Sequence, residues 1–513
     1  MPAPPPPPSP PAPEPSRMAA PTAMATQSAG YVGGTTPEYG SRDNRERYDG
    51  KAVASILAVA DQPVSTFSVD VDTGAYANVR RMLTGGRDVP GEAVRTEELI
   101  NYFRYDYPRP DSREAPFSVT THVSTTPWNP DTRLMRIGLR GYDVSAGGRP
   151  PANLVFLVDV SGSMNEDTKL PLVKKSLAML ADRIGPRDKV SIVAYSGTVA
   201  TVLEPTNNKN YIRQALDCLY AEGSTAGGTA MKSAYALARA NYIQGGVNRI
   251  LMATDGDFNV GVSDNKALID MVKRERDSGI TLTTLGFGMG NYNEAMMEQV
   301  ADAGNGNYAY IDTAMEAQKV LDEELSATLL TIAKDAKVQI EFNPAHVKQY
   351  RLIGYENRAL AAEDFANDHV DAGDIGAGHQ VTALYEIVPA SGTGWLPDRR
   401  YQGNRAPVPS GSGSELAFVK LRYKLPGQSN SKLIERPIPA ALIQSARAPE
   451  GDMAFVTAVA AFGQKLRGDK YLNGFGYAQI GALVPSSDNY WRGEFVRLVR
   501  LAESGQPTRV HRD

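Results

Sequence analysis

Aspartate, serine and threonine residues occur in three short turns whose spacing suits the binding of a hard metal ion. Asp159, Ser161 and Ser163 alternate in the first turn, and residues 223–229 and 254–257 form the other two. Carboxylate and hydroxyl oxygens are ligands for Mg²⁺, Mn²⁺ or Ca²⁺ rather than for Zn²⁺. The chemistry that these residue types favour is therefore the binding of one divalent cation, with Mg²⁺ as the first choice.

The alternation of the first turn can direct three oxygen atoms toward one point, and the glycine between the two serines permits a tight bend. The second turn offers Thr225 and Thr229 as further hydroxyl ligands. With few carboxylates and several neutral hydroxyls, the cation keeps part of its charge. That residual charge favours an acidic group from a partner at an open coordination position. The predicted ligands are Asp159, Ser161, Ser163, Thr225 and Asp255.

Rival interpretations of the same segments fit less well. Residues 255–266 begin like an EF-hand loop, but Val260 stands where that loop requires glycine and Lys266 where it requires glutamate. The glycines at 286, 288 and 290 loosely resemble the fingerprint of a dinucleotide-binding loop, but the third glycine does not have the required spacing. A tight loop between a strand and a helix is therefore favoured. The five histidines lie outside residues 123–345 and show no paired metal spacing. The sequence therefore predicts no catalytic residues and no enzyme.

The elements that must position these turns alternate between strands and helices over residues 149–330. The apolar runs 154–158 and 249–254 are typical of strands that are buried on both faces. Helical stripes separate them, so a doubly wound, mostly parallel α/β sheet is expected. In such a sheet, ligands bind beyond the carboxyl ends of strands, where the strand order reverses. The first and third turns directly follow the two apolar runs.

The regions on either side of this domain have different patterns. Residues 46–148 predict an α+β region in which Asp72 or Thr73 caps a helix, and Asp70 and Asp72 are interpreted as capping and turn residues. Residues 331–513 predict half-buried strands to about 430, namely 338–342, 380–388 and 415–423, and helices after about 450. The aromatic residues Tyr102, Phe103, Tyr105 and Tyr107 are expected to pack in a core. We hypothesise that the two regions share one β-sandwich, into which the α/β domain is inserted.

The first and third turns resemble the metal-ion-dependent adhesion site of von Willebrand factor type A domains. Asp159, Ser161 and Ser163 match that family's Asp-x-Ser-x-Ser motif, and Asp255 matches its distal aspartate. Thr225 lies at the family's usual distance from the following helix, so the resemblance favours it as the threonine ligand, with Thr229 as second choice. Residues 65–81, 245–261 and 352–358 are also similar to a bacterial group with an extra N-terminal region and a C-terminal domain of unknown function. This likeness covers nearly all of residues 60–505, and it implies a cell-envelope protein.

Composition limits the partners and the compartment. The 513 residues carry a net charge of −4, which does not favour nucleic acid. No apolar stretch of about 18 residues predicts a transmembrane helix. Residues 1–45 are rich in proline, alanine and serine and are expected to be disordered, without a signal-peptide pattern. We expect an envelope, periplasmic or surface location if the true start lies upstream, and the cytoplasm otherwise.

The function that these features favour is a non-enzymatic, cation-dependent adhesion or envelope-assembly module. It would capture an Asp or Glu side chain of a protein partner at the metal site. One alternative is an intracellular scaffold or regulatory subunit of a multi-protein machine. A hydrolase that uses the cation as Lewis acid is a further alternative, which the lack of a nearby base disfavours. The oligomeric state stays open.

Overall fold

The computed structural model describes Glu46, Tyr48 and most of the following chain, namely residues 50–69, 71–112, 114–144, 149–224, 227–256, 265–289, 293–324, 330–370, 372–397 and 412–505. The chain divides into a short N-terminal unit, Met1–Asp43, and one compact unit, Asn44–Asp513. All described residues belong to the second unit. Residues 1–45, which were predicted to be disordered, lie wholly outside the described residues.

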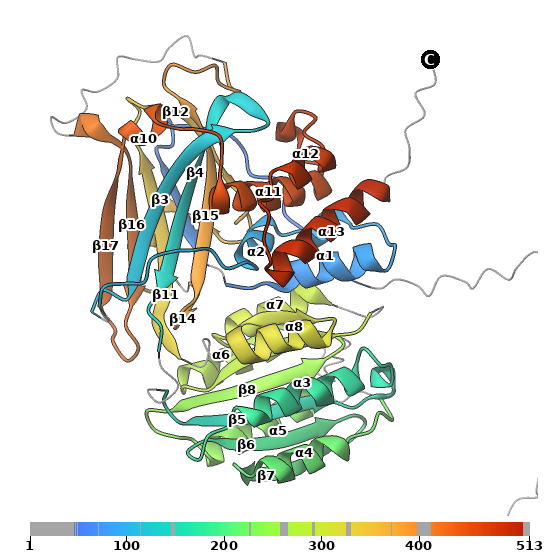
Figure 1. Ribbon diagram of the computed structural model, residues 1–513. Helices are drawn as coiled ribbons and strands as arrows, with labels where there is room; N and C mark the ends of the chain where they lie inside the picture. The colour runs from blue at the N-terminus through green and yellow to red at the C-terminus, as the bar shows by residue number, and fades with distance from the viewer. Residues whose placement is uncertain are drawn as a thin grey trace, which may run out of the picture. The chain divides into compact units, whose positions relative to one another are not determined.

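A mostly parallel six-stranded sheet forms the centre of the α/β domain (Figure 1). In spatial order its strands are β10 (Tyr308–Ile311), β9 (Thr281–Phe287), β8 (Val247–Thr254), β5 (Ala152–Asp159), β6 (Lys189–Tyr195) and β7 (Val199–Thr206). β7 pairs antiparallel with β6 at the edge of the sheet. Every residue of β5 is buried, because helices cover both faces of a parallel sheet. The predicted doubly wound fold is confirmed.

The helices of this domain divide between the two faces of the sheet. α3 (Leu170–Asp182), α4 (Lys209–Asp217) and α8 (Ala314–Gln318) pack on the face of Leu154 and Phe156. α5 (Gly227–Ala240), α6 (Asn265–Asp277) and α7 (Glu294–Ala303) pack on the face of Val155 and Leu157. α8 continues as a π-helix, η4 (Lys319–Glu324).

Two antiparallel sheets pack into a β-sandwich beside the α/β domain (Figure 1). One contains β1 (Leu57–Ala58), β12 (Val347–Ile353), β15 (Gln380–Pro389), β4 (Asn129–Gly141) and β3 (Phe117–Thr126). The other contains β13 (Ala359–Leu360), β2 (Val64–Ser68), β11 (Thr331–Phe342), β16 (Glu415–Lys424) and β17 (Ser431–Pro439), and β14 (Ile375–Gly376) pairs with β11.

Each sheet of the sandwich combines strands from before and after the α/β domain. β2 pairs with β11, where Phe67 lies opposite Val338, and β4 pairs with β15, where Arg136 lies opposite Leu384. The buried side chains between the two sheets also come from both regions. The hypothesis of one shared sandwich with an inserted α/β domain is therefore confirmed.

A helical layer covers the outer side of the first sheet. It contains α1 (Gly74–Thr84), α2 (Thr96–Asn101), α11 (Gly451–Leu466), α12 (Tyr477–Ala482) and α13 (Tyr490–Ser504), while the short α10 (Ala441–Gln444) lies beside β3. Because of this layer, β15 is buried on both faces instead of on one face as predicted. The four aromatic residues from Tyr102 to Tyr107 are buried in the core of this layer, as predicted.

Of the two residues predicted to cap α1, Thr73 occupies the N-cap position, although its side chain makes no capping hydrogen bond. Asp72 instead binds groups that are distant in sequence. Its Oδ1 accepts a hydrogen bond from the backbone N–H of Tyr308 at 3.0 Å, and its Oδ2 lies 3.1 Å from Nη2 of Arg358. The first turn of α1 is instead satisfied by Glu98, whose Oε2 accepts from the N–H of Ala75 at 2.8 Å. Asp72 therefore links the flanking region to β10. Asp70 lies outside the described residues.

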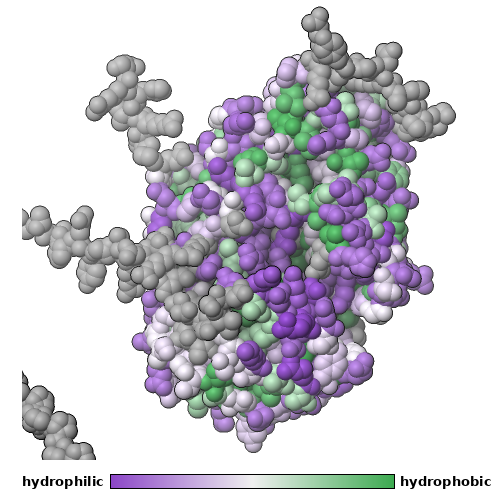
Figure 2. Space-filling model, turned by 180° about the vertical axis from the view of Figure 1, so that it is seen from behind, coloured by the Kyte–Doolittle hydropathy of each residue, from purple (hydrophilic) through white to green (hydrophobic). Residues whose placement is uncertain are grey.

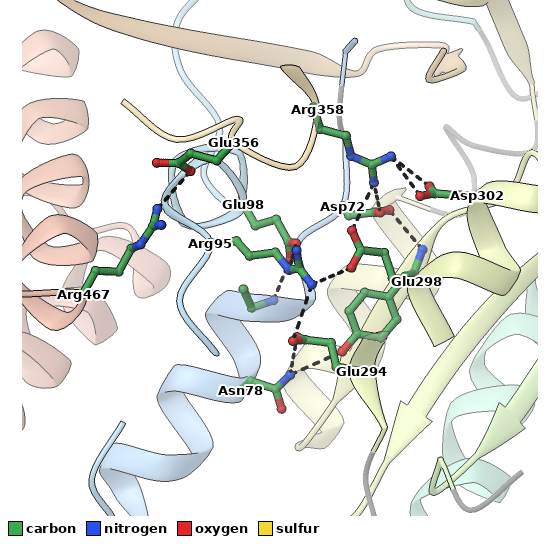
Figure 3. A network of polar contacts seen from close by, with 12 residues as sticks. Asp72, Asn78, Arg95, Glu98, Glu294, Glu298, Asp302, Glu356, Arg358 and Arg467 are labelled. Atoms are coloured by element: carbon green, nitrogen blue, oxygen red, sulfur yellow. Dashed lines mark hydrogen bonds and ion pairs between the residues drawn. The ribbon is translucent and has the colours of Figure 1, made fainter. Parts of the chain in front are cut away.

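Buried ion pairs join α7 of the α/β domain to the flanking regions (Figure 3). Nη2 of Arg95 lies 2.6 Å from Oε2 of Glu298 and 3.9 Å from Oε2 of Glu294, and its Nε lies 3.2 Å from Glu98. Arg358 approaches Glu298 from the other side at 3.5 Å. The guanidinium groups of Arg95 and Arg358 thus both bind Glu298 and link it to carboxylates of the flanking regions.

Replacement of Glu294 by glutamine should stabilise the protein at neutral pH. Burial raises the pKa of the Glu294 carboxyl above its ordinary value of 4.5, Arg95 opposes this and Glu298 adds to it. The native state then holds the proton more tightly than the unfolded chain, so this group lowers stability as the pH rises above 4.5. For Glu294→Gln we expect a gain of about 1–2 kcal/mol at pH ~7.5 and almost none at pH ~5.

Chemical denaturation at the two pH values measures this difference. Glu363→Gln removes the same charge from an exposed side chain and should change the free energy of unfolding by less than about 0.5 kcal/mol. A destabilised Glu294→Gln variant at the higher pH would show that the carboxylate is fully compensated by Arg95.

Candidate metal centre

The candidate metal centre lies at the carboxyl end of the parallel sheet. Asp159 is the last residue of β5, and Asp255 directly follows β8. These two strands are adjacent and parallel, and the strand order reverses beside β5, which is flanked by β8 and β6. A parallel α/β sheet opens into a crevice at such a point. The fold therefore brings together two of the three predicted turns.

The first turn is held by its own polar groups. The backbone N–H of Ser161 donates to Oδ1 of Asp159 at 2.9 Å, and the hydroxyls of Ser161 and Ser163 lie 3.1 Å apart. Burial is complete at Asp159 and nearly so at Ser161, whereas Ser163 is half-buried. The predicted alternation thus places a carboxylate and two hydroxyls along one turn that is open to solvent at one side.

The second turn reaches the first through backbone hydrogen bonds. Glu222 N–H donates to the carbonyl of Val160 at 2.8 Å, and Gly162 N–H donates to the carbonyl of Gly223 at 3.0 Å. A Cβ at position 162 would lie 3.3 Å from that carbonyl oxygen. The φ of Gly162 is not positive, so the glycine permits close approach of two chain segments instead of an unusual bend.

The threonine ligand of the second turn is not described. Thr225 lies outside the described residues, immediately after Ser224. Thr229, the second choice, is exposed within α5. Asp257 also lies outside the described residues. Thr225 therefore stays a prediction, next to a segment that touches the first turn.

The carboxylate of Asp159 is surrounded by donors that the sequence did not single out. Its Oδ2 accepts from the hydroxyl of Thr254 at 2.9 Å and from that of Tyr195 at 3.3 Å. Burial raises the pKa of Asp159 to about 6, hydrogen bonds from Ser161 lower it, and the charge of Asp255 raises it. Position 254 could have been suspected because it precedes Asp255, but Tyr195 comes from another strand and had no sequence signal.

Lys169 is a further neighbour that sequence reasoning missed. Its Nζ donates to Oδ2 of Asp255 at 3.1 Å and to the carbonyl of Ser163 at 3.0 Å. It links the first and third turns directly. In sequence it reads as one of several lysines around α3, so its position became visible only in three dimensions.

The donor set fits a hard divalent cation. Two buried carboxylates and two adjacent hydroxyls supply oxygen atoms, as Mg²⁺ and Ca²⁺ require. Burial raises the pKa of Asp159 despite the hydrogen bonds from Ser161 and Thr254, and a cation beside the carboxylate would favour its charged form. No cluster of three or more His, Cys, Asp or Glu side chains suited to a metal occurs among the described residues. The candidate centre accordingly depends on hydroxyl groups.

Three family models match successive parts of the chain. The family described as von Willebrand factor type A domain matches residues 153–324. The family described as von Willebrand factor matches residues 42–136, and that described as uncharacterized protein YfbK, C-terminal, matches residues 327–504. A von Willebrand factor type A domain is in general a protein-interaction module.

Similar proteins cover most of the chain. Uncharacterized protein YfbK of Escherichia coli (strain K12) is 46% identical over 460 residues, which are 87% of this chain and 79% of that protein. Uncharacterized protein sll0103 of Synechocystis sp. is 27% identical over 332 residues, 63% of this chain and 73% of that protein. A solved structure, von Willebrand factor type A from Catenulispora acidiphila, aligns with a TM-score of 0.41 and 15% identity over 78% of this chain and 91% of that chain. The chain belongs to the family of von Willebrand factor type A proteins that includes YfbK.

Proposed function

We propose that the protein is a non-enzymatic binding module that grips an acidic side chain of a protein partner through a divalent cation. Asp159, Ser161, Ser163 and Asp255, together with Thr225, would hold the cation directly or through water. Mg²⁺ is the preferred ion, with Mn²⁺ and Ca²⁺ as alternatives. The observation that carries the proposal is the meeting of two buried carboxylates with two hydroxyls at a solvent-facing sheet edge.

The rim of the site supports capture of a macromolecule. Gly162, Gly223 and Ser224 are exposed, so a side chain from outside can approach the first turn. Lys169, Thr254 and Tyr195 donate hydrogen bonds to the two aspartates. These hydrogen bonds hold the two carboxylates in fixed positions beside the first turn, as a binding site requires.

The exposed apolar side chains do not indicate which face of the protein a partner binds. Figure 2 shows small hydrophobic patches separated by hydrophilic residues on the face seen from behind. The large exposed apolar side chains of the described residues are spread over several strands, helices and loops: Val202, Tyr211, Tyr220, Tyr242, Met289, Met315, Leu433, Tyr490 and Leu501. None of the helices in the described residues combines the length and apolar character needed to cross a membrane. The cation site is thus the more specific indication of where a partner binds.

Replacement of Asp159 by alanine should abolish cation binding and cation-dependent capture. Loss of a carboxylate that contacts the cation is expected to weaken Mn²⁺ binding by about 100-fold or more, because loss of an outer-shell partner alone costs about 10- to 100-fold. Titration of the full chain with Mn²⁺, followed by electron paramagnetic resonance, measures the affinity. Asp270→Ala, on an exposed position of α6, is the matched control and should bind as the wild type does.

Capture is tested by pull-down from separate envelope and cytosolic extracts with Mg²⁺ or with chelator. The supporting result is a partner retained by wild type and by Asp270→Ala in Mg²⁺, and lost with chelator or with Asp159→Ala. A partner found in the envelope extract favours adhesion or envelope assembly, whereas one found in the cytosol favours the scaffold alternative. Retention that is indifferent to chelator and to Asp159→Ala would refute the mechanism.

A further inference from the structure

Lys169 places a buried positive charge inside the candidate metal centre. Its side chain is only 4% exposed, and its Nζ bonds to Asp255 Oδ2 and to the carbonyl of Ser163. The carboxylate of Glu166, at the rim of the same turn, lies 4.0 Å from Nζ. A lysine that only covered the surface would leave its ammonium group in water. This ammonium is instead enclosed between two of the turns that carry the predicted ligands.

The backbone of the neighbouring strand fixes the path of this side chain. The stem of Lys169 crosses Gly288, just after β9, where a Cβ would lie 2.3 Å from the Cε of the lysine. Gly288 has a φ of +77°, and its carbonyl accepts a hydrogen bond from the hydroxyl of Tyr310. The glycine that resembled part of a dinucleotide fingerprint therefore makes room for Lys169. Segments that follow β5, β8 and β9 together hold the ammonium group in place.

The charge of the centre follows from these contacts. Among the buried groups, Asp159 and Asp255 contribute two negative charges, and Lys169 offsets one of them. The side chain of Glu166 is 43% exposed, so water and salt screen its charge. A divalent cation brings two positive charges against the one that remains negative, so the buried groups and the cation together carry one net positive charge. The lysine therefore repels the cation, and the occupied centre attracts an anion more strongly than a centre without the lysine would.

We propose that Lys169 makes the binding of the cation and of the partner's carboxylate interdependent. This inference rests on the proposed function, and it adds a specific role for one residue. The cation alone binds weakly because the protein supplies too little net negative charge. A carboxylate ligand completes the charge balance and strengthens cation binding, and by linkage the cation strengthens carboxylate binding by the same factor.

Mn²⁺ binding to the full chain, followed by electron paramagnetic resonance with and without acetate at constant ionic strength, tests the inference. Acetate is the probe for the partner's carboxylate. Lys169→Met should bind Mn²⁺ about tenfold more tightly than wild type, which corresponds to about 1.4 kcal/mol. Acetate should strengthen Mn²⁺ binding by about threefold or more in wild type and by clearly less in Lys169→Met.

Three further variants distinguish the effect of losing the Lys169 charge from a structural effect of the substitution. Lys175→Met removes the same charge from an exposed position of α3 and should behave as wild type. Lys169→Arg keeps the charge and should keep the weak Mn²⁺ binding of wild type. Lys169→Gln repeats the comparison with a polar side chain if the methionine variant does not fold.

The outcomes distinguish this inference from the proposed function. If Mn²⁺ binding requires Asp159 but is not strengthened by loss of the Lys169 charge, the inference is overturned and the metal centre stands. A tenfold gain in Lys169→Arg or in Lys175→Met would also overturn it. If neither wild type nor any Lys169 variant binds Mn²⁺ in the presence or absence of acetate, the metal centre and the inference both fail.

Discussion

A chain that ends after Glu324 should fail to fold its N-terminal flanking region, although every residue of that region is present. β2 lies between β13 and β11, and β4 lies between β3 and β15, so removal of the C-terminal part takes away pairing partners of both strands. The sandwich core loses its members from β11, β15 and β16 at the same time. A two-stranded remnant such as β3–β4 is at best marginally stable in water.

Hydrogen exchange measures this effect strand by strand. In the intact protein the amides of β4 should exchange slowly, and in the truncated chain they should exchange without measurable protection. A separate polypeptide of residues 330–505 is the control, because its addition should restore protection if strand pairing is the cause. Slow exchange of β4 in the truncated chain alone would contradict the shared sandwich as a folding unit.

Replacement of Arg351 by methionine should cost about 3–5 kcal/mol of the free energy of unfolding, the range typical of a buried ion pair that loses one partner. Its guanidinium is 1% exposed and bonds to Oε2 of Glu386 at 2.9 Å and to Oδ2 of Asp469 at 2.8 Å. Both carboxylates are almost fully buried. Methionine fills the space but leaves two negative charges without their cation.

The pH dependence of this loss identifies its cause. Burial raises the pKa of Glu386, and Arg351 holds it down, so the carboxyl of the variant should take up a proton more readily. The deficit of Arg351→Met should therefore shrink as the pH falls toward about 5, which denaturation at several pH values can follow. Lys420→Met breaks an exposed pair with Glu341 and should cost less than about 1 kcal/mol. An equal deficit at all pH values would point to lost packing instead.

The sequence by itself determined the elements and the type of chemistry. Continuous apolar runs identified β5 and β8, because strands of a parallel sheet are buried on both faces. The alternation of Asp159, Ser161 and Ser163 after the first run was sufficient to predict oxygen ligands at a sheet edge. Such patterns are local, since each depends on residues within one strand or one turn.

Only the tertiary structure decided which distant segments meet. Asp72 was assigned to a helix cap because its local surroundings suit one, but its partners, Tyr308 and Arg358, follow more than two hundred positions later. Lys169 has no feature in sequence that separates it from an ordinary helix lysine, and its role depends on Asp255 and Gly288. The sequence thus predicted where a cation could bind. The packing of the segments that follow β5, β8 and β9 decided that the buried ammonium group of Lys169 lies beside that site. The physical reason is that the electrostatic surroundings of a side chain are set by proximity in space and not along the chain.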